Sequence, residues 1–130
     1  MAKKIEVVCD GVYDAVVRLI WEKQRGDKAS KEWMDRQARK IIGGTKAVGE
    51  WIKEASKRAH EYVVGNQMSV ADLAVITLCD YLVFCEGRLG DMSGWKEKYP
   101  DMVAYWKRLG ERKEFAETKP VMFDLKEKVV

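Results

Sequence analysis

The 130-residue sequence has few of the residues that build a metal centre or a disulfide scaffold, with one histidine and three cysteines. His60 has no cysteine or second histidine at ligand spacing, so we expect no metal site. Cys9, Cys79 and Cys85 form no C-x-x-C pair and lie inside apolar runs, which is typical of free buried thiols. A reactive thiol at Cys9 is the alternative. Unpaired cysteines indicate a reducing compartment, and we expect a cytoplasmic protein.

The chain also lacks an excess of one charge, because 24 Lys and Arg against 21 Asp and Glu give a formal net charge of +3. The two signs are interspersed, so we expect neither a nucleic-acid partner nor a membrane partner. Acidic residues from Glu6 onward precede any long apolar segment, which argues against a signal peptide or an anchor. Two prolines and ten glycines exclude a low-complexity chain. We expect one globular domain over residues 1–130.

The segment from Lys3 to Gln24 predicts a helix that is apolar around most of its circumference. Its only polar side chains at regular spacing form a ridge made of Glu6, Asp10, Asp14, Arg18 and Glu22. Within the ridge, Asp14 and Arg18 are four residues apart, the spacing of an ion pair on a helix. A helix with so narrow a polar ridge must be covered on more than one side, so we expect its surplus apolar face to contact a further body.

A second helix is predicted to begin after Ser30, a good N-cap residue. Apolar and small residues then follow at alternating spacings of four and three, at Met34, Ala38, Ile41, Thr45, Val48, Ile52, Ala55 and Ala59. This pattern is compatible with a coiled coil. However, Gly43 and Gly44 interrupt it at about 1 kcal/mol each relative to Ala, which favours packing inside a helical bundle.

The most apolar stretch predicts a central helix over 69–86, ended by Gly87 and Gly90. Another helix is expected to begin near Pro100, and a short last one lies around Phe115. No segment alternates with the period of a strand, so the predicted fold is all-α with about five helices. Six aromatic side chains at helical spacings are expected in the core, namely Trp33, Trp51, Trp95, Tyr99, Tyr105 and Trp106.

Two acidic residues of the central helix have predicted structural roles. Ser69 and Asp72 have the spacing of an N-capping box, and Met68 and Leu73 flank it as a hydrophobic staple. We favour this interpretation over Asp72 as a catalytic carboxylate. Asp80 lies in the apolar stretch, and a buried carboxylate there needs a partner, either a hydrogen-bond donor or an arginine.

The chain resembles the helical C-terminal domain of a glutathione S-transferase over about residues 6–120. The motifs that carry the resemblance are Gly65-Asn66-Gln67-Met68-Ser69-Val70-Ala71-Asp72-Leu73, Tyr99-Pro100, Trp106-Lys107-Arg108, Arg112, Phe115, Thr118 and Pro120. In addition, Asp10-Gly11 with Asp14-Ala15 and Asp80-Tyr81-Leu82 with Phe84 are similar to a bacterial-type subgroup. The resemblance therefore implies a glutathione S-transferase C-terminal-like helical bundle.

The resemblance also implies which part of such an enzyme this chain supplies. Family members bind glutathione through an N-terminal thioredoxin-like domain that provides the catalytic Ser, Cys or Tyr, and no such pattern precedes Glu6. We therefore assign no catalytic residue, and we expect glutathione as a cofactor only if a thioredoxin-like domain is supplied. The resemblance makes the first helix a wall of the acceptor-substrate site and part of the dimer surface, with Asp10, Tyr13, Asp14 and Val17 as candidate residues. Asp10 or Asp14 would approach the ammonium group of glutathione.

Three functions are compatible with these observations. The favoured one is a non-catalytic interaction or dimerisation module, with a homodimer or another protein bound through the first helix. The second is a part, either a fragment or a split half, of a glutathione transferase that conjugates glutathione to electrophilic substrates. The third is a binder of a hydrophobic small molecule between the first and central helices.

Overall fold

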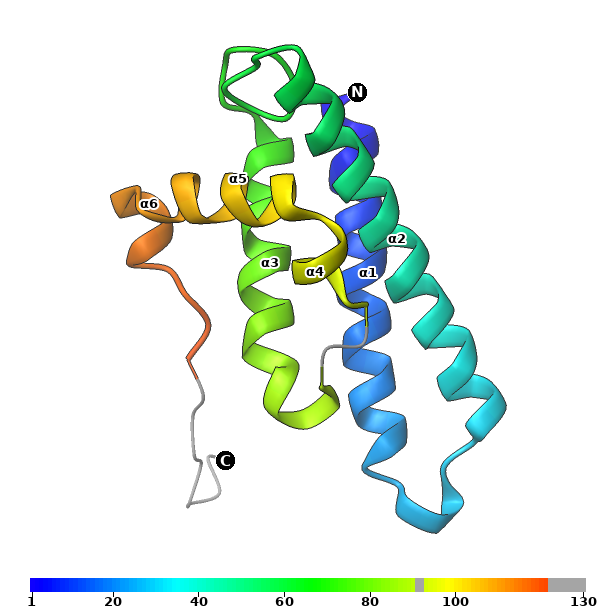
Figure 1. Ribbon diagram of the computed structural model, residues 1–130. Helices are drawn as coiled ribbons and strands as arrows, with labels where there is room; N and C mark the ends of the chain where they lie inside the picture. The colour runs from blue at the N-terminus through cyan, green and yellow to red at the C-terminus, as the bar shows by residue number, and fades with distance from the viewer. Residues whose placement is uncertain (91–92, 122–130) are drawn as a thin grey trace.

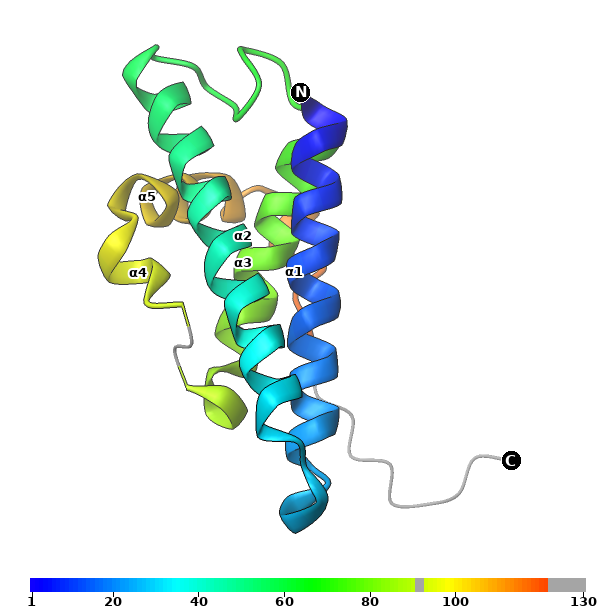
Figure 2. The same ribbon diagram turned by 90° about the vertical axis from the view of Figure 1, so that its right-hand side faces the viewer.

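The computed structural model describes residues 1–90 and 93–121, and this part of the chain contains six α-helices, one short 3-10 helix (Gly26–Lys28) and no strand. Three long helices run side by side (Figure 1), and they are α1 (Ala2–Lys23), α2 (Lys31–Lys57) and α3 (Val70–Leu89). The shorter α4 (Trp95–Lys98) and α5 (Pro100–Gly110) lie on the opposite side of the molecule from α1 (Figure 2), and α6 (Lys113–Ala116) follows them. The predicted all-α bundle is confirmed, and α4 is a helical turn that the sequence did not predict.

The core lies where α1, α2 and α3 meet and where α4 and α5 cover them. Its most deeply buried side chains are Ile5, Val12, Val16, Ile41, Val48, Val75, Ile76, Leu78, Trp95 and Met102. Burial of each such aliphatic side chain contributes about 1.5–3 kcal/mol. Gly44 does not interrupt α2, and it allows a close approach of α1, because a Cβ atom at this position would collide with the Val12 side chain.

The boundaries of α2 and α3 agree with the sequence at their first residues and differ at their last. Ser30 caps α2 as predicted, since its hydroxyl accepts a hydrogen bond from the Trp33 N–H at 3.2 Å. The predicted seam is wrong at Ala59, which lies beyond the end of α2, is exposed and has φ of 54°. Gly87 was also expected to end α3, but it lies within the helix, and only Gly90, with φ of 70°, follows the last residue.

The predicted capping box at the start of α3 is confirmed. The Ser69 N–H donates to Asp72 Oδ2 at 2.8 Å, and the Ser69 hydroxyl accepts from the first turn. The other carboxylate oxygen of Asp72, Oδ1, accepts from the Val63 N–H at 3.0 Å and from the Tyr105 hydroxyl at 2.5 Å. Asp72 is fully buried, and it therefore joins α3 to the preceding loop and to α5.

Several expectations about apolar residues need adjustment. Of the six aromatic residues expected in the core, Trp95 and Tyr105 are buried, and Trp51, Tyr99 and Trp106 are half-buried and pack against the core. Trp33 is half-buried outside that core cluster. Leu73 is 48% exposed, and its contact with Met68 as a staple stays a prediction. None of the helices in the described ranges has the length and apolarity needed to cross a membrane.

Candidate functional site

A groove of about 260 Å³ lies between α1 and α3. Its lining residues come from both helices, Glu6, Cys9, Asp10 and Tyr13 from α1 and Val70, Leu73, Ala74, Thr77 and Leu78 from α3. Three apolar or aromatic side chains on its rim stay open to solvent, with Tyr13 38%, Val70 42% and Leu73 48% exposed. Such a grouping of exposed apolar side chains beside a groove is typical of a binding surface.

The α1 wall of this groove contains two of the predicted site residues, Asp10 and Tyr13. The Tyr13 ring stacks on Tyr81 of α3, with ring centroids 4.0 Å apart, and Tyr81 lies 6.2 Å from Phe84. An aromatic row therefore continues from the groove along α3. Asp10 is exposed and, within the described residues, makes no ion pair.

The other two predicted residues, Asp14 and Val17, line a second hollow further along α1. It has a volume of about 390 Å³ and also includes Trp21 and Trp33. Asp14 forms the predicted ion pair with Arg18 at 2.9 Å. Trp21 is 66% exposed. It was not among the predicted site residues, although its position beside the polar ridge indicates an exposed aromatic side chain. The four residues thus line two hollows along α1, and their role as a wall of an acceptor-substrate site stays a prediction.

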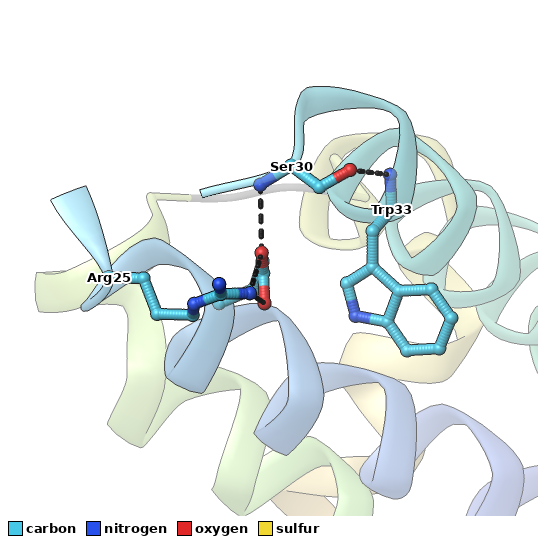
Figure 3. Close-up of polar contacts among 4 residues, drawn as sticks. Arg25, Ser30 and Trp33 are labelled. Atoms are coloured by element: carbon cyan, nitrogen blue, oxygen red, sulfur yellow. Dashed lines mark hydrogen bonds and ion pairs between the residues drawn. The ribbon is translucent and has the colours of Figure 1, made fainter. Parts of the chain in front are cut away.

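Glu22 was expected on the polar ridge, and this is wrong, because the residue is 9% exposed. The Glu22 carboxylate accepts hydrogen bonds from the Ser30 N–H at 2.8 Å and from Arg25 Nη1 at 2.9 Å and 3.1 Å. Figure 3 draws these contacts at Ser30 and Arg25. The Ser30 hydrogen bond, together with the Arg25 interaction, lowers the pKa of Glu22. Glu22 therefore holds the α1–α2 connection and leaves the ridge with four members.

The sequence suggested a ligand site between the first and central helices, but it did not identify the α3 residues that line the groove. Val70 and Leu73 were considered only as parts of the capping segment, although with Thr77 they point out from α3 at spacings of three and four residues. This spacing on an otherwise buried helix is the signal that would have found the wall. The wall matters because it supplies two of the three exposed rim residues.

Thiol and metal chemistry find no support at the groove. Cys9 lies on its floor and is 2% exposed, and burial raises the pKa of its thiol to about 12. Burial likewise raises the pKa of Cys79 and of Cys85, and all three cysteines are free. A raised pKa favours the protonated, less nucleophilic form of these thiols at neutral pH. The parts of the chain that the structure describes hold no group of three side chains able to bind a metal.

Comparison with known proteins places these features in a family. Residues 11–117 match the family model described as glutathione S-transferase, C-terminal domain. A search of curated protein sequences gives no match.

Solved structures of glutathione S-transferases are similar to this chain. One from Methylobacterium radiotolerans, in complex with glutathione sulfonate, has 31% identity and a TM-score of 0.81, covering 99% of this chain and 57% of that one. One from Methylobacillus flagellatus, with GSH bound, has 25% identity and a TM-score of 0.79, covering 92% and 55%. A glutathione transferase family member from Pseudomonas fluorescens, with bound S-(propanoic acid)-glutathione, has 22% identity and a TM-score of 0.74, covering 93% and 57%, and this likeness shows the fold alone.

This chain therefore spans a little over half the length of these relatives. The family model covers most of its residues, and the helical bundle agrees with it. The chain belongs to the glutathione S-transferase C-terminal domain family.

Proposed function

We propose that this chain is a non-catalytic interaction domain whose α1–α3 face binds a thioredoxin-like domain, and that the two together form a glutathione transferase. The observation that carries the proposal is the grouping of three exposed side chains, Tyr13, Val70 and Leu73, around one groove. Leaving them in water forgoes about 25 cal/mol for each Å² of apolar surface, which a docked domain would recover. The catalytic Ser, Cys or Tyr and the main glutathione contacts come from the partner.

In this arrangement α1 faces the acceptor substrate. Asp10 and Asp14 are exposed carboxylates on the ridge, and either suits the ammonium group of glutathione held by the partner domain. Tyr13 and the adjacent Tyr81 offer an aromatic surface for a hydrophobic electrophile. The two domains together would determine which class of electrophile reacts.

The experiment that tests the proposal mixes this chain with the part of the M. radiotolerans relative that this chain does not span, which by the family resemblance would be the thioredoxin-like domain. Sedimentation velocity measures a complex, and conjugation of glutathione to an electrophilic nitroaromatic substrate measures activity. We expect a one-to-one complex, with activity only in the mixture. Two species that sediment independently at micromolar concentrations would contradict docking.

A matched pair of variants identifies the face. Leu73→Asp places a charge on the rim of the groove, whereas Ile42→Asp changes a similarly exposed residue of α2, at 43% against 48% exposure. Leu73→Asp should weaken the complex at least about tenfold, since a buried unpaired charge opposes docking, and Ile42→Asp should not. Equal effects would show that the partner binds elsewhere. If Leu73→Asp changes the sedimentation of the chain alone, the face mediates self-association instead.

A titration of the chain alone with glutathione and S-hexylglutathione, followed by backbone amide NMR, distinguishes this proposal from the binding of a hydrophobic small molecule in the groove. The proposal expects no glutathione response from the helical domain by itself. Shifts centred on Asp10, Tyr13 and Asp14 with S-hexylglutathione only would favour a hydrophobic ligand in the groove.

A further inference from the structure

A much smaller cavity lies between α1, α2, α3 and the start of α4, away from the α1–α3 groove. Its volume is about 10 Å³, close to the space that a single water molecule requires. Aliphatic side chains from three helices form much of its wall, including Val16, Ile41, Leu82 and Leu89. Ser93 and Trp95, at the start of α4, also line it.

The two polar side chains of this cavity are buried, with Ser93 4% and Trp95 1% exposed. Within the described residues, neither Ser93 Oγ nor Trp95 Nε1 has a hydrogen-bond partner. Buried polar groups in folded proteins are almost always bound to protein or to ordered water. Two such atoms, on two residues that line one cavity, therefore point to a small ligand there.

The chemistry of the two atoms restricts this ligand. The indole N–H only donates, so its partner must accept a hydrogen bond, while the serine hydroxyl can both accept and donate. A metal cation is excluded, because an indole N–H is no ligand for it. Water meets every requirement.

We propose that this cavity binds one water molecule that bridges Trp95 and Ser93. The Trp95 Nε1–H donates to the water oxygen, and the water donates one hydrogen to Ser93 Oγ. The backbone of Ser93 is already held, because Lys98 Nζ donates to its carbonyl oxygen at 3.2 Å. The bridging water would therefore help fix the beginning of α4.

Water–protein NMR on the ¹⁵N-labelled full chain tests the proposal directly. Trp95→Phe identifies the Trp95 indole resonance among the five tryptophans of the chain. We expect a cross-peak between the Trp95 Nε1–H and water, with the sign of a long-lived bound molecule. Trp106 provides the control, because its Nε1–H donates to Asp80 Oδ1 at 2.8 Å and needs no water. A spectrum without the Trp95 cross-peak would overturn the proposal.

A double-mutant cycle gives an independent readout. Ser93→Ala and Trp95→Phe should each raise the unfolding equilibrium constant about fivefold, the equivalent of one hydrogen bond. The double variant should raise it by less than the product, because both groups share one water. Independent effects, or single variants that leave the constant unchanged or lower it, would contradict a bridge. If Trp95→Phe does not fold, loss of the Trp95 water cross-peak in Ser93→Ala is the expected result, and its persistence at full intensity contradicts the bridge.

Discussion

Trp106 of α5 donates its indole hydrogen to the Asp80 carboxylate of α3, with Nε1 and Oδ1 2.8 Å apart. Asp80 is 9% exposed and interrupts the most apolar helix of the chain. The sequence required a partner for this carboxylate, and the hydrogen bond to Trp106 confirms the requirement. The bond also joins α3 to α5 across 26 residues of sequence.

Replacing the donor of this bond should destabilise the protein. Trp106→Phe keeps a ring but leaves the buried Asp80 carboxylate without its indole donor, so we expect the free energy of unfolding to fall by about 1–3 kcal/mol. Urea denaturation measures the change. Trp51→Phe is the control, because Trp51 is also half-buried and its main polar neighbour, Lys4 over the ring at 5.7 Å, can still contact a phenyl ring. Equal losses in both variants would mean that ring volume, not the hydrogen bond, is responsible.

The Asp72 carboxylate should contribute more to stability than Ser69, its partner in the capping box. Asp72→Ala leaves the Ser69 and Val63 N–H groups and the Tyr105 hydroxyl without their acceptor, and we expect a loss of at least about 3 kcal/mol. Ser69→Ala removes only a cap, worth about 1 kcal/mol. Thermal and urea unfolding of both variants measure this order. An unchanged melting temperature in either one would contradict the hydrogen bonds described.

The adjacent glycines of α2 should respond to alanine in opposite directions. Gly43→Ala meets nothing within 4 Å and should stabilise the helix by up to about 1 kcal/mol. Gly44→Ala drives a Cβ atom into the stiff, branched Val12 side chain, and overpacking of this kind costs about 1–3 kcal/mol. Denaturation of the two variants measures the difference, with each serving as the control for the other. A gain in stability at both positions would show that α1 and α2 separate without penalty.

Glu22 should make stability depend on pH in the acid range. Its pKa is lowered by the Ser30 hydrogen bond and by Arg25, so its contribution is present above the ordinary value of 4.5 and is lost as pH falls through the lower folded value. Glu22→Gln should therefore be less stable than the parent at pH 7, and the difference should shrink towards pH 3. Glu50→Gln, at a 4.0 Å surface ion pair with Lys46, is the control. A difference that stays constant with pH would contradict this role.

Local patterns in the sequence predicted the contacts that form between residues close together in the chain. The Ser69–Asp72 capping box, the Ser30 cap and the Asp14–Arg18 ion pair all join residues within one turn of helix, so their spacing is sufficient to predict them. The need of Asp80 for a partner was predictable as well.

Contacts between distant segments were not predictable in the same way. The identity of Trp106 as that partner depends on how α5 crosses α3, which no local pattern encodes. Gly44 resembled a helix interruption in the sequence. The structure shows that a glycine is needed there because α1 approaches α2 closely, and this is a contact between distant segments. Similarly, Glu22 matched the period of the polar ridge, and only the path of the α1–α2 connection buries it. The exposure of Val70 and Leu73 could not be predicted either. A continuous apolar stretch does not indicate which face of its helix stays in contact with solvent.

The Glu22 hydrogen bonds also bear on how quickly the chain folds. They join the last turn of α1 to the residue that caps α2, only eight positions apart. Contacts so close in sequence carry a small loop-closure entropy, and chains rich in them reach the native state rapidly. We therefore expect the α1–α2 hairpin to form in the folding transition state, before α5 joins α3. Loss of the Glu22 carboxylate should then slow refolding more than it accelerates unfolding.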